Sequence, residues 1–127
     1  MDEVRGRGVL VTGAAGDIGA EIARAFLARG ARVHVTDVAA EALDRRVRTL
    51  GAGEALSASP ADLQEPAAVL DLAATALAQL GRVDILVNNA AIQAQGDLDS
   101  CTPALFDAAY AVNVRAPYLL ARALVPA

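Results

Sequence analysis

A glycine-rich loop between an apolar run and a helical pattern constrains this chain more than any other feature. Residues 9–11 are consecutive and apolar, which is typical of a parallel strand buried on both faces. Gly13, Gly16 and Gly19 follow, and glycine lets the backbone turn sharply and approach a ligand closely. The helix predicted next directs its first N–H groups and its positive dipole end at this loop, an arrangement that favours binding of a pyrophosphate.

An acidic residue at the end of the next predicted strand strengthens this interpretation. The strand covers residues 32–36, and Asp37 follows it, eighteen residues after Gly19. A carboxylate in this position can accept hydrogen bonds from both ribose hydroxyls of an adenosine. Glycine spacing alone would be weak evidence, but strand, loop, helix and acid in this order predict a nucleotide-binding site.

Length and composition indicate one globular domain, residues 1–127, with a substantial core. Hydrophobic residues make up 55% of the chain and charged residues 20%, which excludes disorder. The net charge of −4 argues against a nucleic-acid partner. All eleven basic residues are arginine, so the sequence contains no lysine.

The remaining compositional signals are mostly negative. Cys101 is the single cysteine, which excludes a disulfide framework and a cysteine metal site. His34, the single histidine, is interpreted as a strand residue rather than a base or ligand. The chain shows neither a signal-peptide pattern nor an apolar run long enough for a membrane span, so we expect a soluble cytoplasmic protein without a membrane partner.

Hydrophobic periodicity predicts the helices and the faces that they bury. The first helix follows the glycine loop and ends at Arg29-Gly30, the second covers residues 39–50, the third begins at Pro66 and ends at Gly81, and the last runs from Thr102 to about Val125 with a bend near residues 113–117. The residues expected on the buried faces of the first and third helices are Ile18, Ile22, Ala25, Phe26, Val69, Leu70, Leu72, Ala73, Ala76, Leu77 and Leu80.

Two further strands complete the pattern. A short third strand is predicted over residues 54–57, and a fourth over residues 84–88. Four strands alternating with four helices force parallel pairing and right-handed crossovers. We therefore predict an α/β fold, a Rossmann-type doubly wound parallel sheet truncated after about four strands and four helices, with strand order 3-2-1-4. This order places the glycine loop and the polar pair Asn88-Asn89 on either side of the topological switch point, where ligands bind.

With these residues in place, the sequence resembles the short-chain dehydrogenase/reductase family along essentially its whole length. Residues 12–19 resemble the family's TGxxxGxG cofactor loop, which includes Ile18, and Asp62-Leu63 resemble its adenine-contacting pair. Residues 88–91 resemble its NNAG motif, so Asn89, Ala90 and Ala91 are implied to contact cofactor. Asn113 matches the asparagine of the catalytic tetrad, which helps to hold a proton-relay water.

Two positions depart from the family pattern. Asp17 stands where the middle glycine of the loop falls, and Ala91 replaces the last glycine of NNAG. Aspartate tolerates left-handed backbone better than most residues, so we expect the turn to survive. The Asp17 carboxylate is nevertheless expected to lie near the pyrophosphate, where it would weaken binding of the cofactor.

The resemblance implies NAD rather than NADP as the cofactor, and the charges agree. Asp37 would repel a 2′-phosphate, while Gly16 and Val38 offer no positive charge to receive one. The arginine cluster Arg45, Arg46 and Arg48 is expected to be largely solvated and too far along its helix to take this role.

The family's catalytic Ser and Tyr-x-x-x-Lys lie beyond the helix that bears the asparagine. This sequence has no lysine, which in the family lowers the pKa of the tyrosine. Residues 118–122 resemble the motif superficially, with arginine in place of lysine, but they begin only five residues after Asn113. We therefore expect the isolated chain to be inactive, with a small alcohol or ketone as substrate only if a catalytic half is supplied.

Three functional hypotheses follow: an NAD-dependent oxidoreductase by ancestry, a dinucleotide-binding module without chemistry, and a structural fragment that binds nothing. A truncated sheet also predicts association, because residues 85–87 would form an unpaired edge and Leu119, Leu120 and Leu124 would be exposed. The expected partner is a second copy, giving an oligomer, or a complementary fragment.

Overall fold

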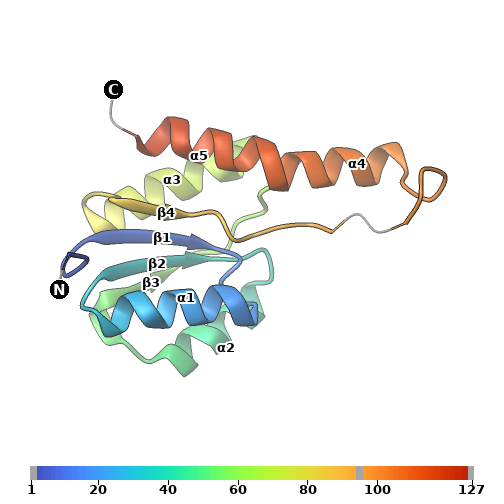
Figure 1. The fold of residues 1–127 in the computed structure, drawn as a ribbon. Helices are drawn as coiled ribbons and strands as arrows, with labels where there is room; N and C mark the ends of the chain where they lie inside the picture. Colours follow the sequence, from blue (N-terminus) through green and yellow to red (C-terminus); the bar gives the residue numbers. More distant parts are fainter. Residues whose placement is uncertain (1–2, 94–95, 126–127) are drawn as a thin grey trace.

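The computed structural model describes residues 3–93 and 96–125, which form a parallel sheet with helices on both faces (Figure 1). The strand order is β3-β2-β1-β4, which confirms the predicted α/β class and topology. The elements are β1 (Gly8–Thr12), α1 (Asp17–Ala28), β2 (Arg32–Thr36), α2 (Ala40–Leu50), the 3-10 turn η1 (Gly53–Ala55), β3 (Leu56–Ala58), α3 (Pro66–Leu80), β4 (Ile85–Val87), α4 (Pro103–Tyr110), the π-helical turn η2 (Ala111–Arg115) and α5 (Ala116–Leu124).

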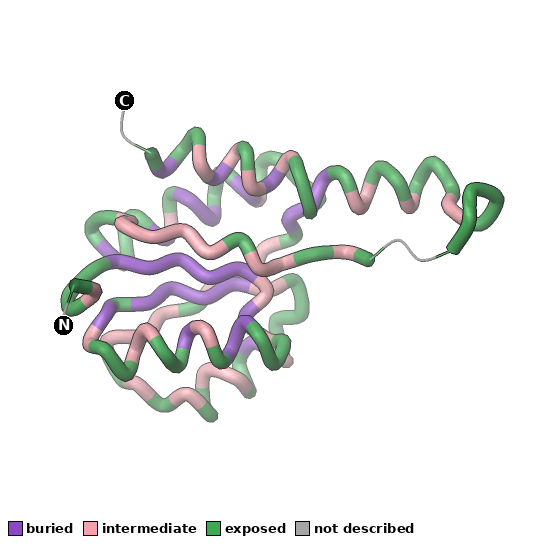
Figure 2. Tube along the Cα trace, viewed as in Figure 1, coloured by how far each residue is buried: buried purple, intermediate pink, exposed green. Residues whose placement is uncertain are grey.

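The sheet separates two hydrophobic clusters. Side chains alternate along β1, so that Val9 and Val11 pack on the side of α1 and α2, while Leu10 packs on the side of α3 and α5. The β1 and β2 backbones are buried over almost their whole length (Figure 2). β1 carries apolar residues at three successive positions, 9–11, which is typical of a strand buried on both faces. β2 instead alternates valine with polar residues, and its His34 and Thr36 are buried as well.

The buried face of α1 differs from the prediction. Ile18 is 72% exposed and Ala25 is exposed, whereas Gly19, Ala20 and Ala23 are the residues that α1 buries. Small residues on this face let the helix approach the sheet closely. Ile22 and Phe26, also predicted for this face, do pack against the core cluster, so the prediction is wrong for Ile18 and Ala25 only.

Two smaller corrections concern β3 and α3. The third strand begins at Leu56, two residues later than expected, because the residues before it form the turn η1. In α3, Leu70 is 50% exposed and Leu77 is 37% exposed, so these two leucines lie outside the buried stripe. The other five residues predicted for that stripe are buried.

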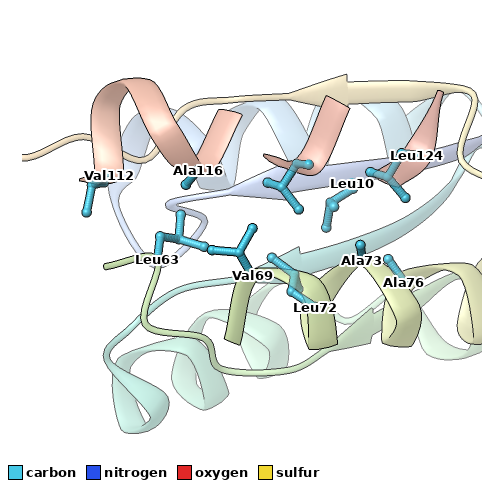
Figure 3. Close-up of a cluster of buried hydrophobic side chains, with 10 residues drawn as sticks. Leu10, Leu63, Val69, Leu72, Ala73, Ala76, Val112, Ala116 and Leu124 are labelled. Carbon is cyan, nitrogen blue, oxygen red and sulfur yellow. The ribbon is translucent and has the colours of Figure 1, made fainter. Parts of the chain in front are cut away.

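The last helix is nearly continuous but contains a π-helical turn at η2, which overlaps the region, residues 113–117, where a bend was expected. Thr102 caps its start, since its hydroxyl accepts a hydrogen bond from Leu105 N at 3.1 Å. The prediction that Leu120 and Leu124 are exposed is wrong. Both are buried in the cluster shared by β1, α3 and α5 (Figure 3), because α3 and α5 lie side by side over one face of the sheet.

His34 forms a buried polar link between β2 and the segment that contains β3. Its side chain is 0% exposed, with Nδ1 2.7 Å from Ser57 Oγ and Nε2 2.8 Å from Ser59 Oγ. Burial lowers the pKa of His34 to about 4, because the charged imidazolium is poorly solvated there. This geometry confirms His34 as a strand residue. It also means that the free energy of unfolding should depend on the protonation of His34.

We predict that acid destabilises the fold through His34. Because the folded-state pKa is depressed, the neutral histidine stabilises the fold above the unfolded pKa, and this stability is lost as the pH falls toward about 4. The shift corresponds to roughly 3 kcal/mol in the free energy of unfolding. Urea unfolding of the wild type and of His34→Gln between about pH 7 and about pH 4 measures it. Parallel pH profiles for the two proteins would contradict the prediction.

Candidate functional site

A cleft of about 280 Å³ opens at the carboxyl ends of the strands, between the loops that follow β1, β2, β3 and β4. This position is the topological switch point of the sheet, since β1 lies between β2 and β4. The cleft is lined by Gly13, Gly16, Thr36, Asp37, Val38, Ala61, Asp62, Leu63, Gln64, Asn89, Ala90, Ala91, Ile92 and Val112.

Thr12 joins the ends of β1 and β4 below the cleft. Its side-chain oxygen accepts hydrogen bonds from Asn89 N at 3.1 Å and from Ala90 N at 3.0 Å. The side-chain Nδ2 of Asn89 in turn donates to Gly13 O at 3.2 Å. These bonds satisfy buried backbone groups and fix the asparagine motif against the glycine loop.

Two of the three loop glycines are required by the packing of the protein itself. Gly13 has φ +67°, and a Cβ there would lie 2.9 Å from both Ala90 Cα and Asn89 Nδ2. A Cβ at Gly19 would collide with Gly13 O and would lie 2.7 Å from Asn89 Nδ2. At Gly16 a Cβ would meet only Gly13 O, at 3.6 Å. Gly16 lines the cleft, so the absence of a side chain there leaves space for a ligand and is not needed for packing of the protein.

Asp37 is held by the backbone around it. Its Oδ2 accepts a hydrogen bond from Ala15 N at 3.0 Å, and its Oδ1 accepts one from Ala39 N at 3.3 Å. The carboxylate is half-buried at the end of β2 and therefore has a defined orientation. Each carboxylate oxygen can accept more than one hydrogen bond, so both retain capacity for a ligand hydroxyl.

Asp17 and the arginine cluster are arranged differently from the prediction. Asp17 is the first residue of α1, and positive φ among the described residues is confined to glycines, so the loop needs no left-handed aspartate. Arg46 is not remote. Its Nη2 lies 2.9 Å from Asp17 Oδ1 and 3.1 Å from Ala15 O, because the long side chain spans the gap between the neighbouring helices α2 and α1.

The loop after β3 forms the opposite wall of the cleft. Asp62 Oδ1 accepts a hydrogen bond from Gln64 N at 3.0 Å, which makes a tight local turn, and Leu63 is buried against Val69 and Val112 (Figure 3). Arg115, at the end of η2, donates to Gln64 O at 2.7 Å. The last helix therefore holds this wall in place.

Asn113 lies in the π-helical turn and fixes the segment after β4. Its Oδ1 accepts a hydrogen bond from Ile92 N at 2.8 Å, and its Nδ2 donates to Ile92 O at 2.8 Å. Ile92 lines the cleft, whereas Asn113 itself does not. These two hydrogen bonds fix the backbone of Ile92, and with it this part of the cleft wall, against the last helix.

The cleft brings together eight of the residues singled out from the sequence: Gly13, Gly16, Asp37, Asp62, Leu63, Asn89, Ala90 and Ala91. It excludes four others, namely Asp17, Ile18, Gly19 and Asn113. Thr36 and Gln64 were missed, although each directly adjoins a predicted residue in the sequence. Val112 was missed because only the packing of the last helix brings it to the cleft.

The strand order, the glycine loop and the acid at the switch point together define a Rossmann-type fold. The family model described as short chain dehydrogenase matches residues 7–127, and the chain therefore belongs to the short-chain dehydrogenase family. No helix in the part of the chain that the structure describes is long and apolar enough to cross a membrane.

Individual relatives agree with this assignment. A probable galactose dehydrogenase of Rhizobium meliloti (strain 1021) is 39% identical over 126 residues, which are 98% of this chain and 49% of that protein. A metagenomic short-chain oxidoreductase solved in complex with NADP is 42% identical, with a TM-score of 0.88 over 97% of this chain and 56% of that one. A 3-ketoacyl-(acyl-carrier-protein) reductase from Brucella melitensis complexed with NADH is 35% identical, with a TM-score of 0.89 over 98% of this chain and 50% of that one. The chain thus spans about half the length of the relatives that it matches.

Proposed function

We propose that this chain binds a nicotinamide dinucleotide in the switch-point cleft, as the cofactor-binding half of an oxidoreductase that transfers a hydride between nicotinamide and an alcohol or ketone. The single observation that carries the proposal is the convergence of the glycine loop, Asp37 and the Asp62-Leu63 wall on one cleft. Solved relatives in complex with NADP and with NADH support it.

The residues of the cleft fit such a group. Gly16 leaves the loop open, and as the N-cap of α1 it has no side chain to cap the first N–H groups of that helix. These groups can bind a phosphate. Thr36 Oγ1 is buried and has no hydrogen-bond partner within the described residues, although Thr36 lines the cleft. A polar ligand there would supply the missing partner.

The preferred cofactor in this proposal is NAD rather than NADP. Asp37 carries a negative charge at the place where a ribose would lie, and Val38 beside it is 67% exposed and uncharged. A 2′-phosphate would meet the Asp37 carboxylate without a nearby free cation, since Arg46 is engaged with Asp17 and Ala15.

Amide NMR of the ¹⁵N-labelled chain during titration with NADH tests the location of the site. The expected result is that the backbone signals of Gly13, Ala15, Leu63 and Ala90 shift with saturation. The signals of Gly81 and Asp84, which lie at the opposite end of the sheet, should stay unchanged. Shifts centred on any other surface would contradict the proposal.

A second candidate is a dinucleotide-binding module that performs no chemistry. It is favoured by Tyr118, which is 60% exposed on α5 and lies outside the residues that line the cleft. The role of Asn113 as a catalytic residue rests on resemblance. Turnover of a panel of small ketones with NADH, measured with a catalytic half supplied in trans, separates the candidates. The half of an oxidoreductase should then oxidise NADH, whereas a pure binding module gives saturable binding without oxidation of NADH.

We also propose that the chain associates with a second copy, through a surface that differs from the leucines of α5 predicted for this role. β4 is an edge strand among the described residues. Along α4, η2 and α5 an exposed apolar stripe recurs at every fourth position: Phe106, Tyr110, Val114 and Tyr118. We predict concentration-dependent self-association in sedimentation, and a monodisperse monomer at all concentrations would contradict it.

A further inference from the structure

The cleft's glycine loop is tied to α2 by one arginine. The Arg46 guanidinium donates to Ala15 O from Nε at 3.3 Å and from Nη2 at 3.1 Å, and the same Nη2 lies 2.9 Å from Asp17 Oδ1. The Arg46 side chain is 25% exposed, whereas that of Asp17 is 98% exposed. Arg46 is therefore the more buried partner of this ion pair.

Charged side chains bind both backbone groups of Ala15. Its N–H donates to Asp37 Oδ2 at 3.0 Å, and its carbonyl accepts from Arg46. The two backbone groups of Ala15, which belong to successive peptide units, thus connect the acid at the end of β2 with the cation of α2. Charge-assisted hydrogen bonds are stronger than neutral ones, so this arrangement sets the position of the loop.

Asp17 suits the helix that it begins but not the anion that the loop is proposed to bind. It is the first residue of α1, where the helix dipole favours an anion. The proposed pyrophosphate would occupy the same field, so that an unpaired Asp17 carboxylate would repel it. Arg46 supplies the opposite charge directly to that carboxylate.

We infer that Arg46 is a positioning residue for the pyrophosphate: by pairing with Asp17 it neutralises the acid in the loop, and the loop then accepts a diphosphate. This inference rests on the proposed dinucleotide function. It assigns a cofactor-related role to a side chain that does not line the cleft. A loop with the acid but without the arginine should be worse than a loop with neither.

Calorimetric titration with ADP and with adenosine tests the inference, because only ADP carries the diphosphate. Arg46→Gln should weaken ADP binding by about tenfold while adenosine binding changes by less than about twofold. Adding Asp17→Asn to Arg46→Gln should restore most of the ADP affinity. Asp17→Asn alone, at a fully exposed side chain, should strengthen ADP binding and gives a test that does not depend on the stability of the Arg46 variant.

Arg48→Gln is the matched control, since Arg48 lies exposed on the same helix and has no hydrogen bond to the loop. It should leave both affinities unchanged. Equal losses of ADP and adenosine in Arg46→Gln, without recovery in the double variant, would show a structural role only and would overturn the inference. A folded wild-type chain that binds neither NADH nor ADP would overturn the proposed function itself.

Discussion

Replacing Gly13 by alanine is expected to cost roughly 3 kcal/mol of folding free energy and to abolish binding of NADH. The backbone at Gly13 has φ +67°, a conformation that costs about 1–2 kcal/mol for a residue with a Cβ. The new Cβ would also lie 2.9 Å from Ala90 Cα, so the two loops that line the cleft would be pushed apart. Urea unfolding and NADH titration measure the two effects.

Gly16→Ala is the matched control for this substitution. Gly16 has an ordinary negative φ of −76°, and a Cβ there meets only Gly13 O at 3.6 Å. The free energy of unfolding should therefore change by less than about 1 kcal/mol, while the added methyl group still reduces NADH affinity because Gly16 lines the cleft. Equal stability losses in the two variants would contradict the steric account of the loop.

The second large effect is expected at Asp37. Asp37→Asn should reduce the preference for NADH over NADPH by at least about tenfold, because the variant loses a charged acceptor for ribose hydroxyls and no longer repels a 2′-phosphate. The asparagine oxygen can still accept one of the two backbone hydrogen bonds, from Ala15 N or Ala39 N. The fold should therefore persist, and the ratio of the two dissociation constants is the measurement.

Asp44→Asn makes the same change of charge on α2, at an exposed position outside the cleft. It should leave the ratio of the dissociation constants unchanged. If Asp44→Asn shifts the preference as strongly as Asp37→Asn, the effect comes from net charge, and the assignment of Asp37 to the ribose would be wrong.

The strands of the sheet were predictable because their patterns are local. β2 covers the residues expected from its alternating and apolar composition, and Gly51 ends α2 with φ +58° as a glycine C-cap. The strand order followed from the alternation of strands and helices. These features depend on short-range chemistry, which a single sequence displays directly.

Apart from the start of β3, the main errors concern contacts between distant elements. Leu120 and Leu124 were expected to be exposed because the sequence alone does not reveal that α3 lies beside α5. The contact of Arg46 with the glycine loop has the same origin, since the reach of a long side chain depends on how two helices are placed. Thr36 was missed because a threonine inside a strand gives no signal until its hydroxyl is seen without a partner.

In the candidate site, too, residues set by local patterns were predictable and residues set by tertiary packing were not. Residues at the ends of strands, such as Asp37 and Asn89, were predictable because parallel strands direct their carboxyl ends to one edge. Gln64 and Val112 line the cleft only because Arg115 and the buried face of the last helix bring them there. Motif spacing identifies the residues at the ends of the strands, and tertiary packing adds the remaining residues of the cleft.

Calorimetric titration of the purified, folded chain with NADH, and separately with NADPH, tests the central claim most directly. The account predicts saturable binding of NADH and a dissociation constant for NADPH at least about tenfold higher, because Asp37 lines the cleft without a free cation beside it. Absence of binding for both nucleotides, in a sample whose circular dichroism shows the α/β fold, would contradict it.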